Sequence, residues 1–156
     1  MSAPEVLPLY LPGSQQLPPS LRSLHPGEFA LHFTEPELAE QIVATNRHRP
    51  SVIGTGQYGI FVARLGPHTD DAPSLLAKLF VGNVARIPRL WSAIAYRTWP
   101  AAPTGLPVVP DLSLPSVPAF YHPTHRAGID TVADYLLAWG VAAPYASGAQ
   151  WLWAEP

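Results

Sequence analysis

Residues 52–64 have the sequence VIGTGQYGIFVAR, in which Gly54, Gly56 and Gly59 interrupt an apolar run. The second half of the stretch is rich in aromatic and β-branched residues, which favour strands. Glycine adopts positive φ angles without steric strain, and tight turns between antiparallel strands require such angles. The pattern therefore predicts a β-hairpin over residues 51–65, with the glycines supplying the turn.

Two elements are predicted directly before this hairpin. Residues 28–33, EFALHF, have the composition of a short strand. In the segment that follows, Thr34 and Glu37 match a capping box and Pro36 stands in the first turn, where its missing N–H is not needed. These signals predict a helix over residues 35–46.

Three further elements are predicted after the hairpin. The apolar run LLAKLFV predicts a third strand over residues 75–81. Large apolar residues at helical spacing predict two more helices, over residues 84–98 and 130–140. The sequence therefore predicts an α+β fold with a single domain, in which helices pack on a small antiparallel sheet.

Proline-rich segments are expected to wrap around this domain. The chain has 20 prolines, and they are dense at the N-terminus and in residues 100–123. We expect an extended arm over residues 1–20, followed by one α+β domain over residues 21–156. The prolines in residues 100–123 predict that no regular element forms there and that the segment runs extended over the surface.

Composition excludes several classes of function. The 9 basic and 11 acidic side chains give a net charge of −2, so no general attraction to nucleic acid or to an anionic membrane is expected. The chain has no cysteine, which excludes disulfides, thiolate metal sites and cysteine nucleophiles. No signal peptide or membrane span is predicted. Together with the composition, rich in arginine, alanine and proline, these features predict a cytoplasmic bacterial protein.

The glycine stretch also has the spacing of phosphate-binding loops. A dinucleotide-binding fold is excluded because a predicted strand, and not a helix, follows the glycines. IGTGQYGIFVAR resembles the glycine loop of protein kinases, and LLAKLF resembles the strand that carries their phosphate-binding lysine. This resemblance implies that Gly54, Gly56 and Gly59 would cover phosphates and that Lys78 would contact them. The chain departs from the family in lacking D-F-G and the glutamate partner of the lysine.

A second resemblance involves the same lysine. KLFVGNV, residues 78–84, resembles the first-strand motif of RNA-recognition-motif (RRM) domains, which implies that Phe80 would stack on a base. The second motif of that family should follow later in the chain. Its nearest analogue here, GQYGIFV, precedes the first motif. The alternative is a buried strand with Leu79 or Phe80 in the core.

Histidines offer two further candidate sites. His122 and His125 stand three residues apart, and two imidazoles at this spacing can share a metal ion if Asp130, Asp134 or His68 supplies a third ligand. In NRHRP, residues 46–50, His48 lies between two arginines that could bind a phosphodiester while His48 performs acid–base chemistry. A solvated helix C-terminus explains this second pattern equally well and is favoured. No metal ion or cofactor is expected.

Binding without catalysis is the predicted function, because every catalytic pattern is incomplete while large aromatic anchors are abundant. The expected partner is a protein, as for an inhibitor, an immunity protein or an accessory subunit. The alternative is a nucleotide- or RNA-binding protein, including a degenerate kinase-like nucleotide site, that uses the glycine turn 54–59 and the strand from Lys78 to Phe80. The residues predicted to contact the partner are three anchors of the arm and three arginines on one face of the predicted helix 84–98: Leu9, Tyr10, Leu11, Arg86, Arg89 and Arg97.

Overall fold

A computed structural model describes residues 21, 24, 26–54, 57–64, 92–112, 119–142 and 151–154. Sheet dominates this part of the chain, with α2 as its one complete α-helix. In chain order the elements are η1 (Pro26–Glu28), β1 (Phe29–Thr34), α2 (Pro36–Thr45), β2 (Ser51–Gly54), β3 (Gln57–Ala63), β4 (Ser92–Trp99), β5 (Leu106–Pro107), β6 (Val109–Pro110), β7 (Ala119–Thr124), η3 (Val132–Asp134), β8 (Leu136–Ala142) and β9 (Trp151–Ala154), where η denotes a 3-10 turn.

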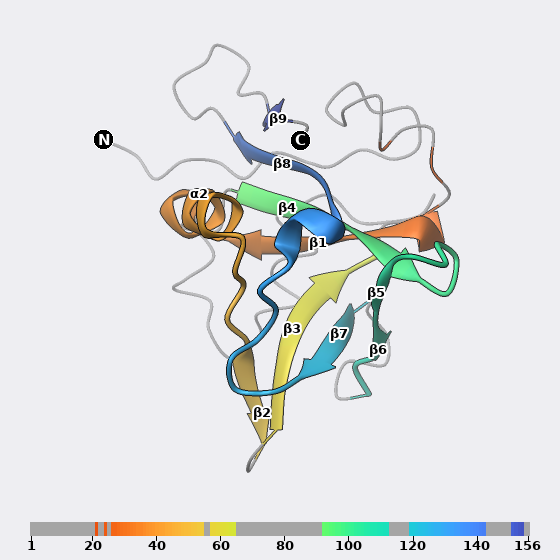
Figure 1. Cartoon of the computed structure of the whole chain (residues 1–156). Helices are drawn as coiled ribbons and strands as arrows, with labels where there is room; N and C mark the ends of the chain where they lie inside the picture. The colour runs from red at the N-terminus through yellow and green to blue at the C-terminus, as the bar shows by residue number, and fades with distance from the viewer. Residues whose placement is uncertain are drawn as a thin grey trace.

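The nine described strands form one sheet in the order β6-β7-β3-β1-β4-β8-β9, with β2 paired to β3 and β5 paired to β4. The β4–β5 pair is parallel, and the other pairs are antiparallel. Twist accumulates across the sheet and curls it into a half-barrel, so that β3 and β7 cross the direction of β4 and β8 (Figure 1). No helix in the described part of the chain is long and apolar enough to cross a bilayer.

The predicted hairpin is confirmed. β2 and β3 are antiparallel, with Ser51 opposite Gly59 and Gly54 opposite Gln57, which leaves a two-residue connection. The connecting residues 55–56 lie outside the described residues. Gly59 lies within β3 and not in the turn, so its predicted role in the turn is wrong.

The strand and helix predicted before the hairpin are also confirmed, as β1 and α2. Pro36 stands at the start of α2, and Asn46 ends the helix in the left-handed conformation with φ 60°. The predicted capping box is wrong, because the N-cap residue is Glu35 and no side chain caps the helix there.

The predicted fold class is wrong, because the two later helices are not formed in the described residues. Residues 92–99 are β4, and the segment predicted as the last helix is η3 followed by β8. β4 lies between β1 and β8, and its residues Ser92–Tyr96 are buried on both faces. A strand covered on both faces lacks polar alternation, so its apolar run can match helical spacing by chance.

The proline-rich segment 100–123 was predicted to contain no regular element, and this is also wrong. It supplies β5, β6 and most of β7. β6 lies at the edge of the described sheet, where Pro110 does not interrupt an interior ladder. The predicted strand 75–81 and the arm 1–20 lie outside the described residues.

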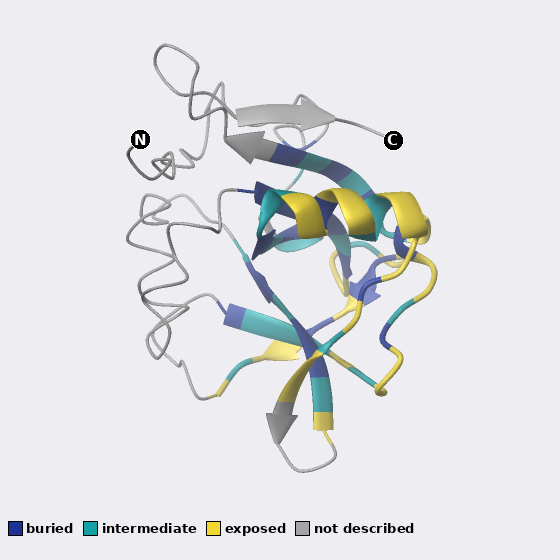
Figure 2. Ribbon diagram, turned by 90° about the vertical axis from the view of Figure 1, so that its left-hand side faces the viewer, coloured by how far each residue is buried: buried dark blue, intermediate teal, exposed yellow. Residues whose placement is uncertain are grey.

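Alternation along the strands builds the core on the concave face of the half-barrel. Ile60 and Val62 of β3 and Ile94 and Tyr96 of β4 point to this face and are buried. α2 packs against the same core through Ala39, while much of the outer surface of the helix is exposed (Figure 2). A polar residue at one of the inward-facing positions of these strands therefore also lies in the core.

Candidate functional site

Both edges of β3 are paired in the structure. β7 pairs with one edge along residues 58–63, and β2 and β1 pair with the other. In a kinase-like arrangement the lysine strand would follow as the next antiparallel neighbour of β3, on the edge that β7 occupies. The described strands therefore lack the order that the kinase resemblance implies. Lys78 and Phe80 lie outside the described residues, so nucleotide or RNA binding stays a prediction.

The residues predicted to contact a partner have different outcomes. Five lie outside the described residues and stay predictions: Leu9, Tyr10, Leu11, Arg86 and Arg89. Arg97 lies on β4 and not on a helix, so the predicted face of three arginines on one helix is wrong. The half-buried guanidinium of Arg97 donates to the carbonyl of Asp134 at 3.1 Å and to the hydroxyl of Thr104 at 3.5 Å.

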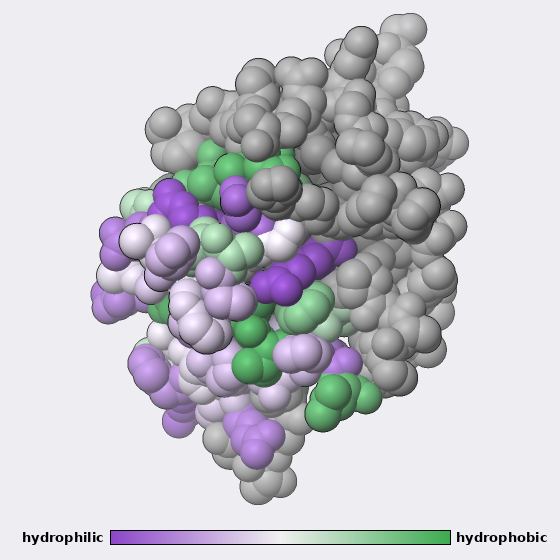
Figure 3. Space-filling view, turned by 90° about the vertical axis from the view of Figure 1, so that its right-hand side faces the viewer, coloured by the Kyte–Doolittle hydropathy of each residue, from purple (hydrophilic) through white to green (hydrophobic). Residues whose placement is uncertain are grey.

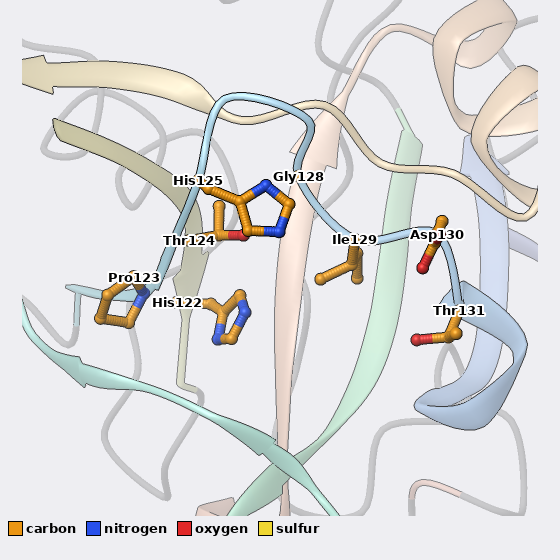
Figure 4. A pocket seen from close by; sticks show the side chains of 8 residues that line it. All are labelled: His122, Pro123, Thr124, His125, Gly128, Ile129, Asp130 and Thr131. Carbon is orange, nitrogen blue, oxygen red and sulfur yellow. The ribbon is translucent and has the colours of Figure 1, made fainter. Parts of the chain in front are cut away.

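An open depression in the surface borders the end of β7 and the turn after it. His122 and His125 line it, with their rings toward Ile129 and with Asp130 beyond (Figure 4). The structure thus brings the histidine pair and one candidate third ligand to the same depression. Even so, no three His, Asp or Glu side chains in the described part of the chain are placed to hold a metal ion. The Nδ1 of His122 instead donates to the carbonyl of Pro107 at 2.7 Å.

A second group of polar side chains, which shares His122 with the depression, lies along the concave face of the half-barrel. Alternation places His32 of β1, Tyr96 of β4 and His122 of β7 on the concave face. His48, from the segment after α2, is 3% exposed, with its Nδ1 2.6 Å from the hydroxyl of Tyr96 and its ring 4.3 Å from that of His32. The expected solvated position is therefore wrong for His48, although both neighbouring arginines are exposed. We call these four residues the histidine cluster.

Hydrogen bonds and burial set the protonation of the cluster. The Nδ1 of His32 donates to the carbonyl of Phe61 at 2.7 Å, since a carbonyl only accepts. Burial, with smaller contributions from the charges of His32 and His122, lowers the pKa of His48 from 6.5 to about 2. Burial also raises the pKa of Tyr96. His48 and Tyr96 are therefore both uncharged at neutral pH.

Sequence reasoning missed His32 and Tyr96. A signal for His32 was present, because in the predicted strand 28–33 it alternates with Phe29, Leu31 and Phe33 and so shares the opposite face with Ala30. Tyr96 had no such signal while its segment was assigned to a helix.

Exposed apolar side chains gather where β4, β5 and β6 lie close together. Trp99 is 49% exposed, Val109 38% and Leu112 84%. Trp99 is opposite Pro107 in the β4–β5 pair, two residues before Val109. Figure 3 faces this side of the molecule and shows hydrophobic residues beside strongly hydrophilic ones. We define the Trp99 strip as Arg64, Arg97, Trp99, Val109 and Leu112.

Two arginines flank Trp99 in this strip. Arg97 alternates to the same face of β4 as Trp99. The guanidinium of Arg64 lies 4.3 Å above the ring of Phe120 and donates weakly to the carbonyl of Trp99, at 3.4 Å. Among the described residues, the buried Nε of Arg64 has no hydrogen-bond partner, and burial lowers the pKa of this side chain. Arg64 is thus joined to the strip through the main chain of Trp99.

Comparisons with known proteins assign no relative to the chain. No family model matches it, and no curated protein or solved structure matches it significantly. Inferences about function therefore rest on the Trp99 strip and the histidine cluster.

Proposed function

We propose that the protein is a non-catalytic binding protein that contacts a partner protein through the Trp99 strip. The observation that carries this proposal is the half-exposed indole of Trp99 at the end of β4, whose preceding residue Thr98 is fully buried. Tryptophan and arginine are the residue types most enriched among those that dominate binding energy at protein interfaces. Here both types lie together on a rigid strand, so little order has to be gained on binding.

Arg64 supports the same proposal. The side chain of Arg64 is half-buried, so a carboxylate of a partner that approaches its exposed part can form a charge-assisted hydrogen bond with the guanidinium. The ring of Phe120 holds the guanidinium in place by a cation–π contact. The strip therefore favours a partner surface that combines apolar side chains with an acidic group.

The histidines of the concave face do not favour catalysis. His48 is 3% exposed, and the Nδ1 atoms of His32 and His122 are engaged by main-chain carbonyls. A general base must come within hydrogen-bond reach of its substrate, which the buried position of His48 prevents. Inhibitors, immunity proteins and accessory subunits act through contacts of the kind that the strip offers. Anchors of the N-terminal arm remain a second predicted contact: Leu9, Tyr10 and Leu11.

The test is a comparison of strip variants with a matched control. A partner captured by cross-linking in a lysate of the organism that encodes the protein would be purified, and its affinity measured by calorimetry. Trp99→Ala and Leu112→Asp are expected to weaken binding by about 30-fold, which corresponds to the loss of about 2 kcal/mol at a dominant contact. Val52→Asp is the control, because Val52 is 68% exposed and pairs with Tyr58, at the other end of β3 from Arg64. Equal affinity for all three variants would exclude the strip as the interface.

A further inference from the structure

Two segments far apart in the sequence are joined next to the histidine cluster. They are residues 46–48, which follow α2, and residues 128–133, which follow the turn after β7. The N–H of His48 donates to the carbonyl of Ile129 at 2.9 Å, and the N–H of Ile129 donates back to the carbonyl of His48 at 3.1 Å. We call this pair of segments the latch.

Asn46 and Gly128 complete the latch. The side-chain amide of Asn46 donates to the carbonyl of Asp130 at 3.2 Å and accepts from the N–H of Ala133 at 2.7 Å. Gly128 has a φ of 74°, and a Cβ atom at this position would lie 2.1 Å from the carbonyl oxygen of His48. The two segments therefore fit closely, although Asn46, Asp130 and Ala133 are exposed.

The latch holds the ring of His48 inside the half-barrel. Its imidazole points inward to Tyr96 and His32, while its backbone is bonded to Ile129. For the ring to reach water, residues 46–48 must move away from the sheet, and this movement breaks their hydrogen bonds to residues 128–133. The β1–β4 and β3–β7 ladders are not part of the latch, so they need not open with it.

We propose that the histidine cluster and the latch form a proton-sensitive device, in which protonation of His48 releases residues 46–48 and 128–133 while the sheet stays folded. This inference does not depend on the Trp99 strip or on any partner.

Charge around His48 gives the physical reason. His32 from β1 and His122 from β7 both disfavour a positive charge at His48, and Tyr96 from β4 contributes only a neutral hydroxyl. On its own segment His48 lies between two exposed arginines, and the carboxylate of the latch, Asp130, is exposed to solvent. An imidazolium at this position would therefore be buried beside two histidines that disfavour its charge, and moving into water relieves both penalties.

The direction of the pH effect follows from the two states of His48. In the closed latch the pKa is lowered to about 2 by burial, whereas a ring released into water has the ordinary value of 6.5. Above pH 6.5 neither state binds the proton, so opening is independent of pH. Below pH 6.5 the open state binds the proton and the closed state does not, so the opening equilibrium constant rises about 10-fold for each pH unit.

Hydrogen exchange measured by mass spectrometry between pH 7.5 and pH 5 tests the proposal on the full chain. After correction for the intrinsic pH dependence of exchange, the amides of residues 129–133 are expected to lose about 10-fold protection per pH unit below 6.5. Amides of β1 and β4 are expected to keep their protection. The proposal is overturned if protection in residues 129–133 stays constant, or if β1 and β4 lose protection in parallel with them.

Two histidine variants test whether His48 causes the pH dependence of hydrogen exchange in residues 129–133. His48→Gln cannot be protonated, so the pH dependence in residues 129–133 should disappear. His125→Gln is the control, because His125 is an exposed histidine of the adjoining turn, and it should behave as wild type. If His48→Gln does not fold, His48→Asn provides the same readout: its side chain cannot be protonated either, so the pH dependence should again disappear. An unchanged slope in the folded variant, or loss of the slope in His125→Gln, refutes the assignment.

Discussion

Replacing Tyr96 by phenylalanine removes one oxygen atom from the centre of the molecule. Tyr96 is fully buried, and its hydroxyl lies 2.6 Å from the Nδ1 of His48. The phenyl ring would keep its packing against Ile94 and the other residues of the core, so the variant leaves almost no cavity. The loss is therefore that of the hydrogen bond, together with a buried Nδ1 that has lost its partner.

The size of the destabilisation expected for Tyr96→Phe follows from the burial of His48. A buried polar atom left without a partner destabilises a protein by about 1–3 kcal/mol, because it regains no hydrogen bond to water. His48 is 3% exposed, so solvent does not replace the hydroxyl. We expect Tyr96→Phe to lower the free energy of unfolding by about 1–3 kcal/mol, and Tm by about 2–4 °C for each kcal/mol in a chain of this size.

Urea unfolding at pH 7.5, followed by tryptophan fluorescence, measures this change. Tyr121→Phe is the matched control: Tyr121 is half-buried, its ring packs 5.9 Å from that of Phe61, and its effect should stay within about 0.5 kcal/mol. Combining Tyr96→Phe with His48→Leu removes both partners of the bond. The double variant should therefore be more stable than the sum of the single effects predicts, by about 0.5–3 kcal/mol.

Equal stability of Tyr96→Phe and Tyr121→Phe would refute this reasoning. It would mean that the hydroxyl of Tyr96 contributes nothing to His48, or that water reaches the ring in the folded protein. In the second case His48 would not be isolated from solvent, and the proton-sensitive latch would lose its physical basis.

Three further predictions concern other parts of the chain. Gly128→Ala should loosen the latch at every pH and lower the free energy of unfolding by about 1–3 kcal/mol, because a side chain at φ 74° would collide with the backbone of His48; hydrogen exchange at pH 7.5 and urea unfolding measure this. ATP should bind no more tightly than millimolar by calorimetry, since β7 occupies the edge of β3 that a lysine strand would need; micromolar binding that is lost in Lys78→Ala would contradict this. Deleting residues 1–16 should leave Tm nearly unchanged but weaken binding to the partner, because the terminal position of this proline-rich arm favours contact with a partner; a much lower Tm would instead place the arm in the core.

Short-range signals in the sequence determined the elements around residues 28–63. Aromatic and β-branched residues on both sides of closely spaced glycines predicted the β2–β3 hairpin, and Pro36 marked the start of α2. Such signals depend on residues only a few positions apart, whose conformations are limited by local sterics and hydrogen bonds. They were sufficient here because glycines and a proline mark the boundaries of these elements, although β1 and most of β3 are buried on both faces.

Tertiary structure alone decided the strands of residues 92–99 and 136–142. Both segments are apolar runs, and helical or strand spacing fits each of them. β4 became a strand because β1 and β8 pair with its two edges, and no local feature of its sequence specifies those partners. This long-range pairing, and not residue propensity, made the fold mostly sheet.

The histidine cluster likewise could not be derived from the sequence. His32, His48, Tyr96 and His122 come from β1, the segment after α2, β4 and β7. They meet because the strand registers bring one side of each strand to the concave face, and a shift of one residue would turn the side chains of that strand to the opposite face. The sequence determined which side chains are available, whereas the register of distant strands decided that an uncharged histidine lies at the centre of the protein.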